Sequence, residues 1–209
     1  RRHWQDDLQS LVVPSRAFTE WKLLRHLRHL GIPAPEPLAY GEKRARGVLR
    51  DSCLITEALD AAFPLKTFVP ATWSVPARGR AFEEKRTLWT SLGGRIADLH
   101  EHGIYFRDLH DGNILCRRAP GNAVELFFID PAKARCLSRL TPAQRVRDLA
   151  SLRSSASFGT AASWVRFLKS YLAASSVSTL PWKTFFRNVE QTHCAAWERH
   201  LKSRNKRCL

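Results

Sequence analysis

Two short apolar runs joined by a turn sequence constrain the fold of this chain more than any other feature. The runs are Asn113 to Cys116 and Val124 to Ile129, and the segment between them, RRAPGNA, contains the Pro-Gly-Asn order typical of turns. They predict an antiparallel hairpin. In such a pair, the residue that enters the first strand lies beside the residue that leaves the second. Asn113 and Asp130 hold these two positions, so we expect their side-chain oxygens to converge.

Converging carboxylate and amide oxygens are ligands that Mg²⁺ accepts, with water and phosphate completing its shell. Asp108 lies five residues before Asn113 in the stretch YFRDLHDGNILC, and the loop between them is short. We therefore expect Asp108 to face the same point as a base. Each residue alone is common at turns and strand starts. The ordered set Asp-x4-Asn, strand, turn, strand, Asp is far more specific than any of its parts.

The N-terminal third predicts a helix followed by a small sheet. Apolar residues recur every three or four positions over Ser15 to Leu30, and Gly31 and Pro33 mark the end of that helix. Glu20 lies at the edge of the apolar face. Its carboxylate either needs a cation or, as an exposed first-turn acid, complements the helix dipole. The segment GVLRDSCLITEAL then predicts two short strands or one bulged hairpin, packed on the helix.

The rest of the chain predicts mainly helix. Residues 65–79 are expected to form an irregular connection, because prolines stand at positions 64, 70 and 76. A second amphipathic helix begins at Ala81 and is closed by Gly103, and the Gly93-Gly94 pair inside it suggests a close packing contact. Periodicity predicts three more helices, over Leu140 to Ser155, Ala161 to Ala174, and Pro181 to about Lys202.

Composition and charge restrict the class of protein. The 209 residues are 44% hydrophobic and include seven Trp, enough for a globular core. The 34 Lys and Arg exceed the 19 Asp and Glu, which gives a net charge of +15 in scattered clusters. Such a surface favours polyanions, such as nucleic acid, anionic lipid or phosphorylated glycan, although each cluster alone is consistent with a solvated surface. No apolar run approaches the roughly 18 residues of a spanning helix, so we expect a soluble or peripheral protein.

Cysteine and histidine spacing gives no sign of a disulfide framework or a zinc site. The five cysteines are an odd number without a C-x-x-C pair, which favours a reducing compartment. His26 with His29, and His100 with His102, are interpreted as surface histidines, because no third and fourth ligands stand at suitable spacing.

The ordered set also resembles a known family. Asp108-x4-Asn113-Ile-Leu followed by Phe-Phe-Ile-Asp130 is similar to the catalytic loop and metal-binding aspartate of the protein-kinase-like fold. More narrowly, SRAFTEWKLLRHLRHLGIPAPEPLAYGE, HEHGIYFRDLHDGNIL and VRDLASL resemble the lipopolysaccharide core kinases, the Kdo/heptose kinase group of Gram-negative bacteria. The resemblance runs from about Ser15 to about Leu152.

This resemblance implies an α+β, protein-kinase-like fold with two lobes. Residues 1–60 are expected to form a partial N-terminal lobe with a small sheet and a helix, residues 61–80 a connection, and residues 81–209 a mainly helical lobe that carries the catalytic loop. Its cofactors would be ATP and Mg²⁺. Asp108 would be the catalytic base that orients and deprotonates a sugar hydroxyl. Asn113 and Asp130 would bind Mg²⁺ against the nucleotide phosphates, and Glu20 would pair with the ATP-binding lysine.

Two further residues and three departures qualify the resemblance. Asp148 would brace the catalytic loop, and Arg107 would bind phosphate or brace the loop. Phe106 replaces the histidine of H-R-D, and Asp130-Pro-Ala replaces D-F-G, which argues against a protein-kinase activation segment. No Gly-rich loop and no lysine-bearing strand precede Glu20, where only Arg1, Arg2 and His3 open the chain, and the sequence contains no methionine. We therefore expect a chain truncated upstream.

The leading hypothesis is an ATP-dependent kinase that phosphorylates a sugar of the lipopolysaccharide inner core at the cytoplasmic face of the inner membrane. Its expected partners are a lipopolysaccharide or lipid A-core acceptor and an anionic membrane surface. Nucleic acid is not expected, since charge without a motif is a weak signal. Two alternatives stay open: an aminoglycoside-type small-molecule phosphotransferase, and a non-catalytic kinase-like binding module.

Overall fold

The structure of the chain is a computed structural model that describes residues 14–73, 79–120, 123–155, 160–177 and 181–205. It divides into two compact units: Arg1–Asp60 with Phe127–Lys133, and Ala61–Leu126 with Ala134–Leu209. Residues 61–80, expected as a connection, thus group with the second unit. Residues 1–13, the segment before Glu20 in which no lysine-bearing strand was expected, lie outside the described residues.

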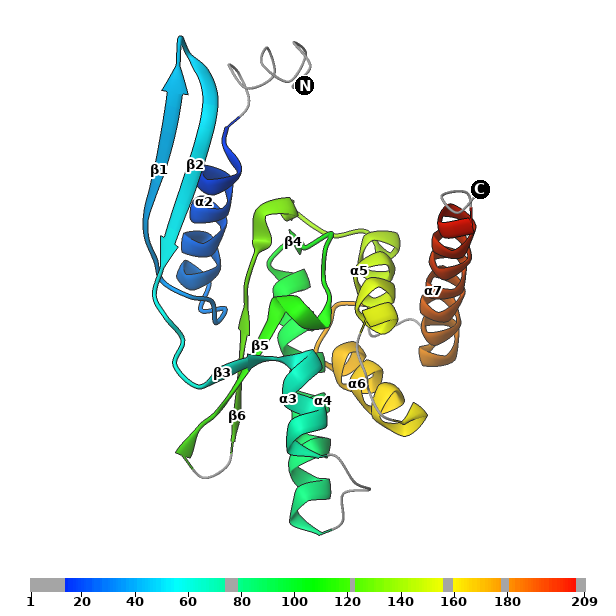
Figure 1. Ribbon diagram of the computed structural model, residues 1–209. Coiled ribbons are helices and arrows are strands. Elements are labelled where there is room, and N and C mark those ends of the chain that lie inside the picture. Colours follow the sequence, from blue (N-terminus) through cyan, green and yellow to red (C-terminus); the bar gives the residue numbers. More distant parts are fainter. Residues whose placement is uncertain (1–13, 74–78, 121–122, 156–159, 178–180, 206–209) are drawn as a thin grey trace. The chain divides into compact units, whose positions relative to one another are not determined.

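The first unit is built from one helix and one hairpin. Helix α2 (Arg16–His29) begins where Ser15 accepts a hydrogen bond from the Phe18 amide, and its face with Leu24 and Leu27 is buried. The predicted helix is therefore confirmed. Strands β1 (Pro37–Ala45) and β2 (Val48–Thr56) pair antiparallel with two irregularities, and both contact α2 (Figure 1). The predicted small sheet on this helix is confirmed, but the expectation of two strands within GVLRDSCLITEAL is wrong: that segment forms β2 alone, and its partner β1 comes from the proline-containing segment before it.

Near its start, the second unit contains a helix where the prolines had predicted an irregular connection. After β3 (Ala62–Pro64), residues Leu65–Thr72 form helix α3, not an irregular connection. Leu65, Phe68 and Val69 are buried at helical spacing. Pro70 stands near the end of this short helix, so it removes only one backbone hydrogen bond. Burial of the apolar stripe outweighs that loss.

Helix α4 (Arg80–Glu101) is the central helix of the second unit and packs along α6 (Ala161–Ala173). Gly93 lies at the crossing, since a Cβ there would meet the Phe167 carbonyl oxygen at 2.4 Å. The predicted close contact is confirmed for Gly93, whereas the space beside Gly94 is open. After α4, Gly103 turns the chain with a φ of 76°.

The predicted hairpin follows the turn. The chain passes through β4 (Ile104–Tyr105), the short 3₁₀ helix η1 (Asp111–Asn113) and β5 (Ile114–Arg118), and β5 pairs with β6 (Val124–Phe128) and β3. The short connection between β5 and β6 requires an antiparallel pair. β6 is followed by η3 (Pro131–Lys133), which begins directly after Asp130.

The remaining elements complete the second unit. Strand β7 (Arg135–Cys136) pairs with β4, and α5 (Pro142–Ser155) packs against α7 (Trp182–Asn205). The three C-terminal helices were predicted from their periodicity. Trp89 and Trp164 are among the largest fully buried side chains of this core. Among the described residues, every helix is too short or too polar to cross a membrane.

Candidate active site

The loop between β4 and η1 holds Asp108, the predicted base. Its side chain is half-buried, while Asn113 at the end of η1 is only 6% exposed. The Asn113 side-chain Nδ2 donates a hydrogen bond to the Asp108 main-chain oxygen at 3.1 Å. The structure therefore brings these two predicted residues together. Because the donor half of the Asn113 amide is used inside the loop, its oxygen is the half available to a cation.

Asp148, on α5, holds this loop by its backbone. One carboxylate oxygen accepts from the Phe106 amide and the other from the Arg107 amide, each at 2.8 Å. Asp148 is 1% exposed, so these charge-assisted bonds lie out of water. The bracing contact predicted for Asp148 is confirmed. Arg107 has a left-handed backbone, with a φ of 67°, and its side chain is exposed.

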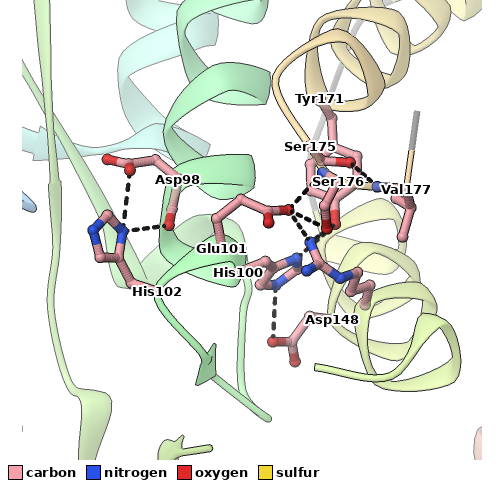
Figure 2. A network of polar contacts seen from close by, with 10 residues as sticks. Asp98, His100, Glu101, His102, Asp148, Tyr171, Ser175, Ser176 and Val177 are labelled. Atoms are coloured by element: carbon pink, nitrogen blue, oxygen red, sulfur yellow. Dashed lines mark hydrogen bonds and ion pairs between the residues drawn. The ribbon is translucent and has the colours of Figure 1, made fainter. Parts of the chain in front are cut away.

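His100 corrects the prediction that this histidine lies on the surface. Its side chain is 0% exposed, and its Nε2 lies 3.3 Å from an Asp148 carboxylate oxygen. Figure 2 shows this contact within a larger polar network that includes Tyr171 and Glu101. The signal was present in the sequence, because His100 stands four residues after Ile96 on the apolar face of its helix. His102, by contrast, is partly exposed and pairs with Asp98.

In the first unit, Glu20 lies near Asp130. Burial raises the pKa of Glu20 above its ordinary value, the charge of Asp130 raises it further, and Arg16 opposes both. Arg16 also holds Asp130 with one guanidinium nitrogen, at 2.8 and 2.9 Å from the two carboxylate oxygens. The sequence argument missed Arg16, although it stands four residues before Glu20 on the same side of α2.

The predicted site residues thus form two pairs, Asp108 with Asn113 and Glu20 with Asp130. A shared metal at Asn113 and Asp130 stays a prediction. The donor chemistry fits it, since a carboxylate and an amide oxygen are both hard ligands of the kind Mg²⁺ takes.

Comparison with known proteins identifies the family of this chain. The model of the lipopolysaccharide kinase (Kdo/WaaP) family matches residues 3–171. The chain is 30% identical over 175 residues to the lipopolysaccharide core heptose(I) kinase WaaP of Escherichia coli, covering 80% of this chain and 64% of that relative. It is 31% identical to 3-deoxy-D-manno-octulosonic acid kinases of Xylella fastidiosa, over 50% of this chain, and of Pasteurella multocida, over 52%. The chain spans 37% and 41% of the lengths of these two relatives.

The fold is also shared with a solved structure. WaaP in complex with acyl carrier protein matches 90% of this chain and 76% of its own chain, with a TM-score of 0.66 and 24% identity. The predicted α+β, protein-kinase-like fold is thereby confirmed. Because the family model matches well over half of the residues, the family predicted from the sequence is confirmed as well. The chain belongs to the lipopolysaccharide kinase (Kdo/WaaP) family.

Proposed function

We propose that this chain carries the catalytic loop of an ATP-dependent phosphotransferase that acts on a sugar hydroxyl, Kdo or heptose, of the lipopolysaccharide inner core. Family membership supports the substrate class. The observation that carries the reaction type is the loop geometry: Asp148 fixes the backbone before Asp108, and Asn113 closes the loop behind it. This holds one half-buried carboxylate in a set position, as phosphoryl transfer requires.

In this proposal, Asp108 orients the acceptor hydroxyl and accepts its proton as the oxygen bonds to the γ-phosphorus of ATP, while the bond from that phosphorus to the bridging oxygen breaks and ADP leaves. The chain's own groups need do little covalent chemistry, because this reaction depends mainly on positioning and charge neutralisation. Asn113 and Asp130 would hold Mg²⁺, which would supply charge neutralisation for the nucleotide phosphates. Glu20 serves the nucleotide by pairing with an ATP-binding lysine. The raised pKa of Glu20, caused first by burial and then by Asp130, supports this role, because a half-buried carboxylate needs a cation.

The partners proposed for the chain are anionic. A net charge of +15 favours both an acidic glycolipid acceptor and the negatively charged inner face of a bacterial inner membrane, where the protein would bind peripherally. The relative WaaP was solved with acyl carrier protein, so we add that protein to the partners to be tested. The same charge disfavours an aminoglycoside acceptor, which is itself cationic.

The decisive test is Asp108→Asn. We expect transfer from labelled ATP to dephosphorylated lipopolysaccharide to fall by roughly 10²- to 10⁴-fold, the usual contribution of a general base. Binding of ATP in the presence of Mg²⁺ should stay near the wild-type value, because Asp108 is assigned to the acceptor and not to the metal. Asp111→Asn is the matched control, since it makes the same exchange three residues later, at the start of η1, and should keep transfer.

The outcomes separate the three hypotheses. Preferential labelling of an aminoglycoside by the wild-type protein would move the assignment to a small-molecule phosphotransferase. Absence of transfer to any acceptor, with ATP binding retained, would favour a non-catalytic binding module. Full transfer to lipopolysaccharide by Asp108→Asn would remove Asp108 from its assigned role.

A further inference from the structure

A buried line of polar side chains joins three helices of the second unit to the catalytic loop. The Tyr171 hydroxyl, on α6, lies 2.8 Å from Nδ1 of His100, on α4, and Nε2 of His100 lies 3.3 Å from the Asp148 carboxylate, on α5 (Figure 2). Asp148 in turn accepts hydrogen bonds from the backbone amides of Phe106 and Arg107. Tyr171, His100 and Asp148 are each at most 1% exposed.

The direction of these hydrogen bonds follows from the groups at the two ends of the line, Arg145 and Asp148. Arg145, on α5, lies with Nη1 3.4 Å from the Tyr171 oxygen, and a guanidinium can only donate. The Tyr171 oxygen accepts from Arg145. At the other end the Asp148 carboxylate can only accept, so Nε2 of His100 donates to it and Nδ1 is the acceptor for the Tyr171 hydrogen. With Nδ1 accepting, His100 carries its proton on Nε2 and donates it to Asp148. One tautomer of His100 satisfies every contact.

The ionisation states support this direction. Burial lowers the pKa of His100 despite the opposing effect of Asp148, which keeps the ring neutral. Burial also raises the pKa of Tyr171 to about 12, so its hydroxyl keeps its proton. Burial acts to lower the pKa of Arg145, but Tyr171 and Glu101 outweigh it and the net shift is upward. A fixed cation thus stands at one end of the line and a carboxylate at the other.

The cationic end is itself anchored. Glu101 accepts from Arg145 Nη1 at 2.7 Å, and the same Glu101 oxygen accepts from the Ser176 amide at 2.9 Å and the Ser176 hydroxyl at 3.2 Å. Burial acts to raise the pKa of Glu101, but Ser176 and Arg145 together lower it, so Glu101 is ionised. Gly93 of α4 has no side chain, so α6 can pack closely against α4. This close packing brings Ser176, which follows α6, within hydrogen-bonding distance of Glu101.

We propose that Tyr171, acting through His100, is a positioning residue for the catalytic base: its hydroxyl donates to Nδ1 and so stabilises the His100 tautomer that donates to Asp148, which holds the loop that carries Asp108. This inference rests on the proposed function for its kinetic readout and on the structure alone for its spectroscopic one. In this proposal, α6 helps to set the position of Asp108, although it lies far from the loop in sequence.

The test is Tyr171→Phe in the full-length protein. The variant keeps the ring that stacks on Phe185 at 5.8 Å and removes only the hydroxyl. We expect kcat for transfer to dephosphorylated lipopolysaccharide to fall about 10-fold, while the KM for ATP changes less than about twofold, because a loop shift affects the transition state more than nucleotide binding. The amides of Phe106 and Arg107 should exchange with solvent faster. In wild type, ¹⁵N spectra should show His100 Nδ1 unprotonated, and its resonance should move in the variant.

Phe185→Leu is the matched control, because it disturbs packing on the same ring and keeps the hydroxyl. It should leave kcat and the two loop amides near their wild-type values, even where it lowers the melting temperature. Equal losses of kcat in the two variants would overturn the proposal, as would a wild-type His100 protonated at Nδ1 or wild-type kcat in Tyr171→Phe. If wild type transfers phosphate to no acceptor, the proposed function fails, and the amide exchange and ¹⁵N spectra still decide the positioning role.

Discussion

Two residues with left-handed backbones flank the chemistry proposed for this protein. Arg107, directly before Asp108, has a φ of 67°, and Asp130 has a φ of 50°. Such conformations cost a residue with a side chain of the order of 1 kcal/mol or more and persist where the surroundings hold them. Here Asp148 holds Arg107 by accepting a hydrogen bond from its amide, and Arg16 holds Asp130 by donating hydrogen bonds to its carboxylate. Strain at both positions supports a functional reason for their geometry.

Glu20 is a predicted site residue whose charged form destabilises the folded protein, and this can be tested. Because burial and then Asp130 raise its pKa, the folded state binds a proton at Glu20 more tightly than the unfolded state does. This contribution to stability is present at low pH and is lost as the pH rises through the raised pKa. Glu20→Gln should therefore raise the melting temperature at pH 7 and change it less at pH 4.

Thermal unfolding across this pH range checks the prediction, and Glu57→Gln, an exposed position, is the control. The same Glu20→Gln protein should bind ATP more weakly, if Glu20 pairs with the ATP-binding lysine. A lower melting temperature at pH 7 would show that the Arg16 attraction dominates at this site.

At the scale of the element, hydrophobic spacing was a better guide than proline. Helix α3 forms although Pro70 lies inside it, because Leu65, Phe68 and Val69 bury one continuous stripe. Helices α2, α4, α5, α6 and α7 follow the apolar periodicity from which they were predicted. Helix burial also explains why His100 was misplaced: its position on the apolar face of α4 carried more information than its polarity.

The Gly93-Gly94 pair in α4 allows a matched experiment on helix packing. A Cβ at Gly93 would meet the Phe167 carbonyl oxygen at 2.4 Å and the Tyr171 nitrogen at 2.9 Å, and backbone atoms cannot move aside cheaply. We expect Gly93→Ala to lower the free energy of unfolding by about 2 kcal/mol.

Gly94→Ala is its control, since nothing lies within 4 Å of a Cβ there. It should raise the free energy of unfolding by roughly 0.5–1 kcal/mol through helix propensity alone. Denaturant unfolding measures both variants, and equal effects of the same sign would contradict the packing account.

At the scale of the whole molecule, the net positive charge predicts how the protein interacts with membranes. The excess of 34 basic over 19 acidic residues predicts binding to vesicles that contain anionic lipid, and weaker binding as salt screens the attraction. Vesicle sedimentation between low and high salt measures this, with purely zwitterionic vesicles as the control. Equal binding to both kinds of vesicle, or binding insensitive to salt, would count against an electrostatic membrane contact.

The sequence by itself determined the local parts of this protein and the family. Periodicities of two and 3.6 residues act between near neighbours, so helices α2, α4, α5, α6 and α7 and the hairpin of β5 and β6 could be predicted, and the order of Asp108, Asn113 and Asp130 indicated the kinase-like loop. Only the tertiary structure decided which distant side chains meet. Tyr171 reaches His100 across 71 residues, and Arg16 reaches Asp130 across 114. Such contacts depend on how helices pack against their neighbours, as at Gly93, and no local pattern encodes that geometry.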